Sequence, residues 1–189
     1  MLRIFATFFP PRHERCNGKC RLYKIFTFHF SLFTLGEGSI LRAVVQRVSE
    51  AYVTVEGKET GRIEKGLMVL LGVETGDTEK DAAYMAGKIA KLRIFEDENE
   101  KMNLSVQDVG GKVLAVSQFT LLGDARGQNR PGFTLAERPE RANELYEVCC
   151  AEIRKLGVPV ENGVFRTHMM VTLTNDGPVT ILLDSHKTF

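Results

Sequence analysis

Long apolar segments are missing from this chain of 189 residues. No run reaches the roughly 18 residues that a membrane-spanning helix needs, although 43% of the residues are hydrophobic and 26% are charged. This composition is ordinary for soluble globular proteins, and the length suffices for one sizeable core. We therefore predict a soluble protein with no membrane partner.

Cysteine is scarce as well, at four residues. Cys16 and Cys20 form a CxxxC pair without a histidine partner at ligand spacing, and the adjacent Cys149 and Cys150 would diverge in direction on a helix. Neither pair predicts a metal site. We expect inert, reduced thiols in a cytoplasmic protein that uses neither a metal nor an organic cofactor.

A strongly basic surface is also missing, since the formal net charge is only +1. Residues 1–40 hold six of the 25 basic residues and two of the 24 acidic ones, which leaves 19 basic and 22 acidic residues from position 41 onward. Proteins that grip a duplex present basic stripes that displace counterions. We expect no DNA partner, while a pocket for one nucleotide end is compatible with this charge.

Residues 1–40 show neither helical nor strand periodicity, and seven phenylalanines lie there among scattered basic residues. Three interpretations compete: a targeting peptide, a tail that contacts RNA, and an upstream start assignment that adds a disordered, non-native extension. We favour the third, because regular patterning begins abruptly at Leu41. The functional domain is predicted to comprise residues 41–189.

From residue 42 onward the pattern predicts an α+β fold with a mostly antiparallel, barrel-like sheet and two main helices. Thr78 is a candidate N-cap for a helix that ends near Lys91, and a second helix should run from Pro139 to Leu156. The predicted strands are residues 42–48, 51–55, 67–73, 92–95, 113–117, 158–164, 169–173 and 179–183. The irregular segment 122–138 is unusually long for a compact domain, so we expect it to border a site.

Two short segments carry the functional information. Ser-Gln-Phe-Thr-Leu, residues 117–121, would ordinarily be the end of a strand. Asn-Asp-Gly-Pro, residues 175–178, would ordinarily be a hairpin turn, because Asp-Gly between apolar strands is a turn signal. In this order and at this spacing, the two segments resemble the paired signature motifs of the D-aminoacyl-tRNA deacylases.

The resemblance covers about residues 41–185, including 42–49, 101–104, 108–111, 130–133 and 163–184. It implies a homodimer that hydrolyses the ester joining a D-amino acid to the 3′ end of tRNA. It places four catalytic-pocket residues at Ser117, Gln118, Phe119 and Thr120. It assigns substrate-binding roles to Gly177, Pro178, Arg47, Met169 and Phe133.

In such a dimer the Gly177-Pro178 segment, with a cis peptide bond, would enter the pocket of the other subunit, and Arg47 would hold that segment in place. Its backbone carbonyls would occupy the space of an L side chain, so only a D-residue or glycine would fit. This implies broad tolerance of side-chain identity and some activity on glycyl-tRNA.

The sequence lacks the parts of a conventional hydrolase: there is no Gly-x-Ser-x-Gly elbow and no histidine near Ser117. An aminoacyl ester is already activated, however, so a positioned water and an oxyanion acceptor would suffice. The backbone N–H groups of Phe119 and Thr120 would bind the oxyanion, and a ribose hydroxyl of the terminal adenosine would assist. Thr120 as nucleophile is the competing hypothesis, less favoured because no base is visible.

Three departures from the family pattern concern RNA contact: Arg-Thr-His at 166–168 in place of small residues followed by Asp, Gly132 in place of a common serine, and Gly127-Gln128 in a usually basic loop. Two other functions stay open. One is a noncatalytic module that binds an RNA end, and the other is an achiral or L-selective editing deacylase.

Overall fold

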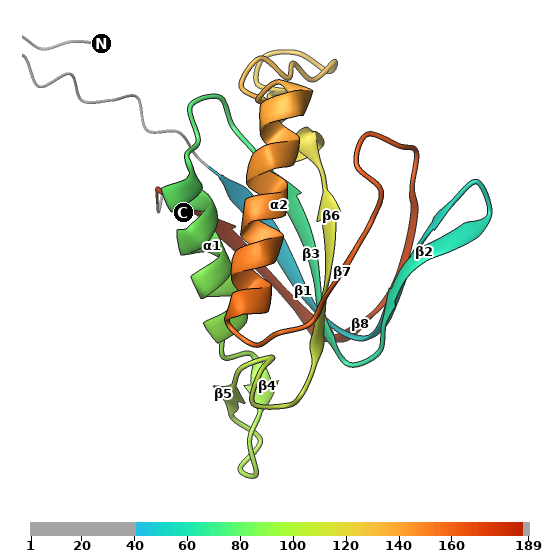
Figure 1. Cartoon of the computed structure of the whole chain (residues 1–189), viewed down its shortest axis with the longest axis vertical. Helices are drawn as coiled ribbons and strands as arrows, with labels where there is room; N and C mark the ends of the chain where they lie inside the picture. Colours follow the sequence, from blue (N-terminus) through green and yellow to red (C-terminus); the bar gives the residue numbers. More distant parts are fainter. Residues whose placement is uncertain (1–40, 187–189) are drawn as a thin grey trace, which may run out of the picture. The chain divides into compact units, whose positions relative to one another are not determined.

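The computed structural model describes residues 41–186. The interpretations of residues 1–40, including the Cys16 and Cys20 pair, lie outside the described residues. The described part is an α+β unit in which two helices lie side by side against one face of a mixed sheet (Figure 1). The strands are β1 (Arg42–Val55), β2 (Lys58–Ile63), β3 (Gly66–Gly72), β4 (Phe95–Glu96), β5 (Met102–Leu104), β6 (Lys112–Ser117), β7 (Val160–Asn162) and β8 (Met170–Asp184). The helices are α1 (Glu79–Lys91), the short 3₁₀ helix η1 (Phe119–Leu122) and α2 (Pro139–Lys155).

The sheet curls until its two ends approach each other. Its order is β2-β1-β3-β6-β7, and β8 pairs with β1. β1 is antiparallel to β2, β3 and β8, whereas the β3–β6 and β6–β7 pairs are parallel. A side chain at Gly61 in β2 would place its Cβ 2.8 Å from the backbone oxygen of Asn162 in β7. This close approach makes the sheet nearly barrel-like and confirms the predicted fold class.

Two apolar clusters stabilise this arrangement. The larger fills the space between the sheet and the helices, with fully buried side chains that include Leu67, Ile89 and Leu145. The smaller cluster is formed by side chains of strands β1, β2, β3 and β6, among them Ile63, Met68 and Leu114. Each fully buried aliphatic side chain contributes about 1.5–3 kcal/mol. Within residues 41–186, no helix is long and apolar enough to cross a membrane.

Local sequence signals set the helix boundaries. The Thr78 backbone N–H donates to the Asp81 carboxylate at 3.0 Å, so α1 begins where the capping pattern predicts. Pro139 opens α2, a position where its missing N–H has no intrahelical partner to lose. Gly157 follows the end of α2 with φ of +86°, the left-handed conformation typical of a helix C-terminus.

The predicted turn at residues 175–178 does not reverse the chain. The two flanking segments, predicted as separate strands, belong to the single strand β8, because both find their partner in β1. Asn175 pairs with Val48 and Thr180 pairs with Gln46, so that Arg47 alone faces residues 176–179. The predicted turn residues therefore form a bulge that projects from a continuous strand.

β1 is likewise one strand where two were predicted, and its irregularity appears as register shifts at Gln46/Val48 and Val48/Glu50. The segments predicted at 92–95 and 158–164 are shorter strands than expected, β4 and β7. Strand β2 was not predicted, because Lys58–Ile63 is mostly polar and its only two buried residues are Gly61 and Ile63.

Candidate active site

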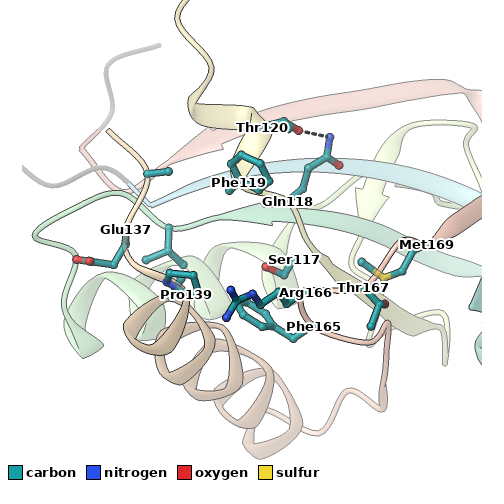
Figure 2. A pocket seen from close by; sticks show the side chains of 13 residues that line it. Ser117, Gln118, Phe119, Thr120, Glu137, Pro139, Phe165, Arg166, Thr167 and Met169 are labelled. Carbon is teal, nitrogen blue, oxygen red and sulfur yellow. Dashed lines mark hydrogen bonds between the residues drawn. The ribbon is translucent and has the colours of Figure 1, made fainter. Parts of the chain in front are cut away.

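A cavity of about 450 Å³ opens where β6 ends (Figure 2). It lies among the β6–η1 junction, the start of α2 and the segment that leads into β8. Five of the predicted site residues line it: Ser117, Gln118, Phe119, Thr120 and Met169. Ala136 and Glu137 also line it, so the irregular segment 122–138 does border the cavity.

The Ser117–Thr120 segment is held by the sheet that precedes it. Ser117 pairs with Leu71 of β3, and the Gln118 N–H donates to the Leu71 oxygen at 2.8 Å. A Cβ at Gly72 would lie 3.0 Å from the Gln118 backbone oxygen, so a side chain at this position would press on the cavity wall. The wall of the cavity is thus an extension of a core strand.

The chain turns into η1 directly after Gln118. The Leu121 N–H donates to the Gln118 oxygen at 3.3 Å, the first bond of this turn. The N–H groups of Phe119 and Thr120 open the turn and therefore have no acceptor within it. The Gln118 side-chain amide donates to the Thr120 hydroxyl at 3.0 Å. The turn consequently offers two adjacent backbone donors at the cavity wall.

Phe119 and Phe133 form an aromatic pair beside the opening. Their ring centroids are 5.1 Å apart at an interplanar angle of 69°, the edge-to-face arrangement that aromatic pairs favour. Phe119 is 56% exposed. Phe133, a predicted substrate-binding residue, therefore contacts a lining residue and does not itself line the cavity.

The opposite wall is packed against α2. The Phe165 ring lies 6.3 Å from that of Tyr146, whose hydroxyl donates to the Ala115 oxygen at 2.9 Å. Burial raises the pKa of Tyr146, which therefore stays a neutral hydrogen-bond donor. A Cβ at Gly163 would lie 2.7 Å from the Met169 sulfur, so this glycine leaves the space that Met169 occupies. These contacts fix the two pocket residues Phe165 and Met169.

Only two of the lining residues carry a charge, Glu137 and Arg166. The Glu137 carboxylate accepts from the Arg138 N–H at 2.6 Å and from the Gly76 N–H at 3.4 Å. Backbone donors thus occupy both of its oxygens. The lining residues include no histidine, lysine or cysteine.

The Gly177-Pro178 segment lies apart from this cavity. Neither residue lines the cavity, both are exposed, and their peptide bond is cis. Arg47 Nε donates to the Asp176 backbone oxygen at 2.9 Å, and Arg47 Nη1 donates to the Ile94 oxygen at 2.8 Å. The structure therefore places Arg47 against the projecting loop, but it does not bring the loop to the pocket.

A second contact closes the base of the loop. The Val179 N–H donates to the Asn175 side-chain oxygen at 2.7 Å, and the Asn175 amide donates to the Thr180 hydroxyl at 3.2 Å. Val179 is 7% exposed and belongs to the larger apolar cluster. The loop thus projects from a base that is fixed on both sides.

Most of the described unit is similar in sequence to a known protein family. The family model described as D-Tyr-tRNA(Tyr) deacylase matches residues 44–184. The chain belongs to this family. A relative from Koribacter versatilis (strain Ellin345), named D-aminoacyl-tRNA deacylase, is 66% identical over 149 residues, which are 79% of this chain and 100% of the relative. A relative of the same name from Clostridioides difficile (strain 630) is 60% identical with the same coverage.

The solved structure of a protein called c-Myc DNA Unwinding Element Binding Protein has a TM-score of 0.72 and 43% sequence identity to this chain. The similarity covers 75% of this chain and 97% of that one. The family prediction is confirmed, and so is the prediction of a hydrolase of the D-aminoacyl-tRNA deacylase class. The sequence reasoning did not single out Phe165 or Glu137 as pocket residues, and it noted Arg166 only as a departure from the family pattern.

Proposed function

We propose that this protein hydrolyses the ester of D-aminoacyl-tRNA in the cavity beside Ser117–Thr120, releasing a free D-amino acid and tRNA. The observation that carries the proposal is the position of the family's signature segment, which forms the cavity wall at the opening of η1. The names of the relatives support the same reaction. We further propose that the enzyme acts in the cytoplasm.

Backbone donors supply the electrostatic part of the reaction in this proposal. As water attacks the ester carbon, the carbonyl oxygen becomes an oxyanion that accepts hydrogen bonds from the Phe119 and Thr120 N–H groups. In studied hydrolases one such donor is worth roughly 10²–10³ in rate. A ribose hydroxyl of the terminal adenosine assists the attack. The bond between the acyl carbon and the ribose oxygen then breaks, and that oxygen gains the proton lost by the attacking water and leaves as a hydroxyl group of free tRNA.

Thr120 is not the nucleophile in this account. Its hydroxyl oxygen accepts a hydrogen bond from the Gln118 amide, and an amide N–H cannot remove the hydroxyl proton. A threonine nucleophile needs an adjacent base, and the lining residues provide only Glu137, whose oxygens accept from Gly76 and Arg138. The Gln118–Thr120 contact instead stabilises the turn that presents the two donors.

The chiral filter requires a second subunit. The Gly177-Pro178 loop is exposed, firmly held at its base and outside its own subunit's cavity. We propose that a homodimer inserts each loop into the cavity of the partner, where its carbonyls exclude an L side chain but admit hydrogen. A D-residue or glycine therefore reacts, and the identity of the side chain matters little.

Release of labelled amino acid from D-tyrosyl-, L-tyrosyl- and glycyl-tRNA by the full chain tests this function. We expect rapid release from the D form, slower release from glycyl-tRNA and none from the L form. Ala142→Phe, which fills the cavity from α2, is the matched inactive control. Equal release from D and L would support an achiral deacylase. Binding without release would support a noncatalytic RNA-end module.

A further inference from the structure

Arg166 is the one cationic side chain among the residues that line the cavity. It also lines a second cavity of about 210 Å³, which shares Pro139 and Phe165 with the first. Arg166 therefore stands where the two cavities meet. Figure 2 shows its side chain beside Phe165, on the side of the pocket where α2 begins.

The backbone around Arg166 is fixed in an unusual conformation. The Gly163 N–H donates to the Ala115 oxygen at 2.9 Å, and the Thr167 hydroxyl donates to the Val164 oxygen at 2.9 Å. Between these contacts Arg166 has φ of +60°, a left-handed conformation that few residues other than glycine adopt. An arginine at this point combines an unfavourable backbone conformation with a defined position at the cavity rim.

Arg166 lacks the ion pairs that Arg141 and Arg126 form. Arg141 forms ion pairs with Glu79 at 2.8 Å and Glu144 at 3.0 Å, and Arg126 pairs with Asp124 at 2.7 Å. Among residues 41–186, no carboxylate lies within 4.0 Å of the Arg166 guanidinium. The rim therefore offers one planar, permanently charged donor group that the protein itself leaves unpaired.

We propose that Arg166 binds the phosphate that links the terminal adenosine of tRNA to the preceding nucleotide. The inference rests on the proposed function. With the aminoacyl end in the larger cavity, the RNA continues past Arg166 toward the smaller one, and the first anionic group along it is this phosphate. The guanidinium forms bidentate, charge-assisted hydrogen bonds to phosphate oxygens. Arg166 is thus a substrate-positioning residue, and it belongs to the segment 166–168 in which this chain departs from the family pattern.

Two substrates separate the phosphate contact from every other role. D-tyrosyl-adenosine has the ester, the sugar and the base but no phosphate, and D-tyrosyl-tRNA has all four. We expect Arg166→Gln to raise KM for D-tyrosyl-tRNA roughly 3- to 10-fold, the range of an exposed charge pair or slightly more, with little change in kcat. For D-tyrosyl-adenosine, neither constant should change.

Salt dependence gives a second readout. The tRNA end is single-stranded, so loss of one phosphate contact should reduce the slope of log(kcat/KM) against log[salt] by about 0.7. Lys112→Gln is the matched control, because it removes one exposed positive charge at the opposite end of β6 and should leave the slope unchanged. Arg166→Gly should behave like Arg166→Gln, since glycine adopts a positive φ without strain.

The inference fails if Arg166→Gln impairs both substrates equally, because Arg166 would then act on the acyl group, the nucleoside or the dimer. It fails equally if neither substrate is affected. Should the wild-type protein hydrolyse neither substrate, the proposed function fails, and binding decides the inference separately. Arg166→Gln should then weaken binding of a CCA trinucleotide but not of adenosine, and unchanged trinucleotide binding would overturn the phosphate contact.

Discussion

Arg47 holds Asp176 across the bulge of β8, with its Nε 2.9 Å from the Asp176 backbone oxygen and 3.2 Å from the Asp176 carboxylate. The arginine side chain is only 6% exposed, whereas that of Asp176 is 48% exposed. A buried cation thus anchors an exposed loop. Because Arg47 Nη1 also donates to the Ile94 oxygen, it ties the loop to the segment between α1 and β4.

Removal of the Arg47 guanidinium should release the loop. Arg47→Ala leaves the Ile94 oxygen without its donor, so we expect a loss of about 1–3 kcal/mol in the free energy of unfolding and a fall in D-tyrosyl-tRNA hydrolysis on the order of tenfold or more. Arg47→Lys should give intermediate stability and activity, since an ammonium lacks the planar fork that reaches both the Asp176 and the Ile94 backbone oxygens. Denaturant unfolding and initial rates measure the two effects.

Arg62→Ala is the control for this experiment. Arg62 is an exposed arginine that pairs with Glu59 and Glu50, and such surface pairs contribute little to stability because solvent screens them. Its removal should change neither stability nor activity substantially. Full activity in a folded Arg47→Ala protein would contradict the anchoring role.

Loss of the Thr120 hydroxyl should be tolerated. Thr120→Val keeps the shape of the side chain and both backbone donors, so we expect kcat to fall by no more than about tenfold, whereas loss of a true nucleophile removes several orders of magnitude. Gln118→Ala should have an effect of similar size, because the two side chains form one contact. Single-turnover rates distinguish the cases, and a loss of a thousandfold in Thr120→Val would restore the nucleophile hypothesis.

The thiols of Cys149 and Cys150 should resist alkylation in the folded protein. Burial raises the pKa of both thiols, so at any given pH less reactive thiolate is present than in an exposed cysteine. We expect slow modification by iodoacetamide up to about pH 9, where an ordinary thiol of pKa about 8.5 is mostly ionised. Peptide mass spectrometry with and without denaturant measures this, and rapid labelling of the folded chain would refute it.

A chain that begins with Leu41→Met should fold and retain activity. The Leu41 side chain is fully buried, its N–H donates to the Ser185 hydroxyl at 3.1 Å, and its oxygen accepts from the Ser185 N–H at 3.0 Å. Relatives are matched over their full length by 149 residues of this chain. We expect an unfolding midpoint close to that of the full chain and D-tyrosyl-tRNA rates within about twofold of it. A folded but inactive product would assign residues 1–40 a function.

Local signals predicted the helices and much of the sheet, because caps, glycine stops and apolar spacing act over a few residues. Thr78 and Pro139 begin their helices as predicted. The bulge at residues 176–179 could not be predicted, since the same Asp-Gly signal suits a hairpin and only pairing with β1 decides between them. Strand β2 lacked a signal because Lys58–Ile63 is mostly polar and only Gly61 and Ile63 are buried.

The candidate site shows the same division. Ser117–Thr120 and Met169 line one cavity, although they are distant in sequence. Phe165 and Glu137 belong to the cavity through packing between α2, β6 and two loops, which the sequence does not reveal. The sequence marks Arg166 only as a departure from the family pattern. Its left-handed backbone conformation and its lack of a carboxylate partner are properties of the folded chain.

The central claim is that the pocket of one subunit works with the loop of its partner. Ala142→Phe fills the pocket, and Gly177→Ala distorts the loop because its Cβ would lie 2.6 Å from a Val179 methyl group. Each variant alone should be inactive on D-tyrosyl-tRNA. After unfolding and refolding together in equal amounts, mixed dimers should restore about a quarter of wild-type activity, since half of the dimers then contain one intact site. No recovery in demonstrated mixed dimers would contradict a site built from two subunits.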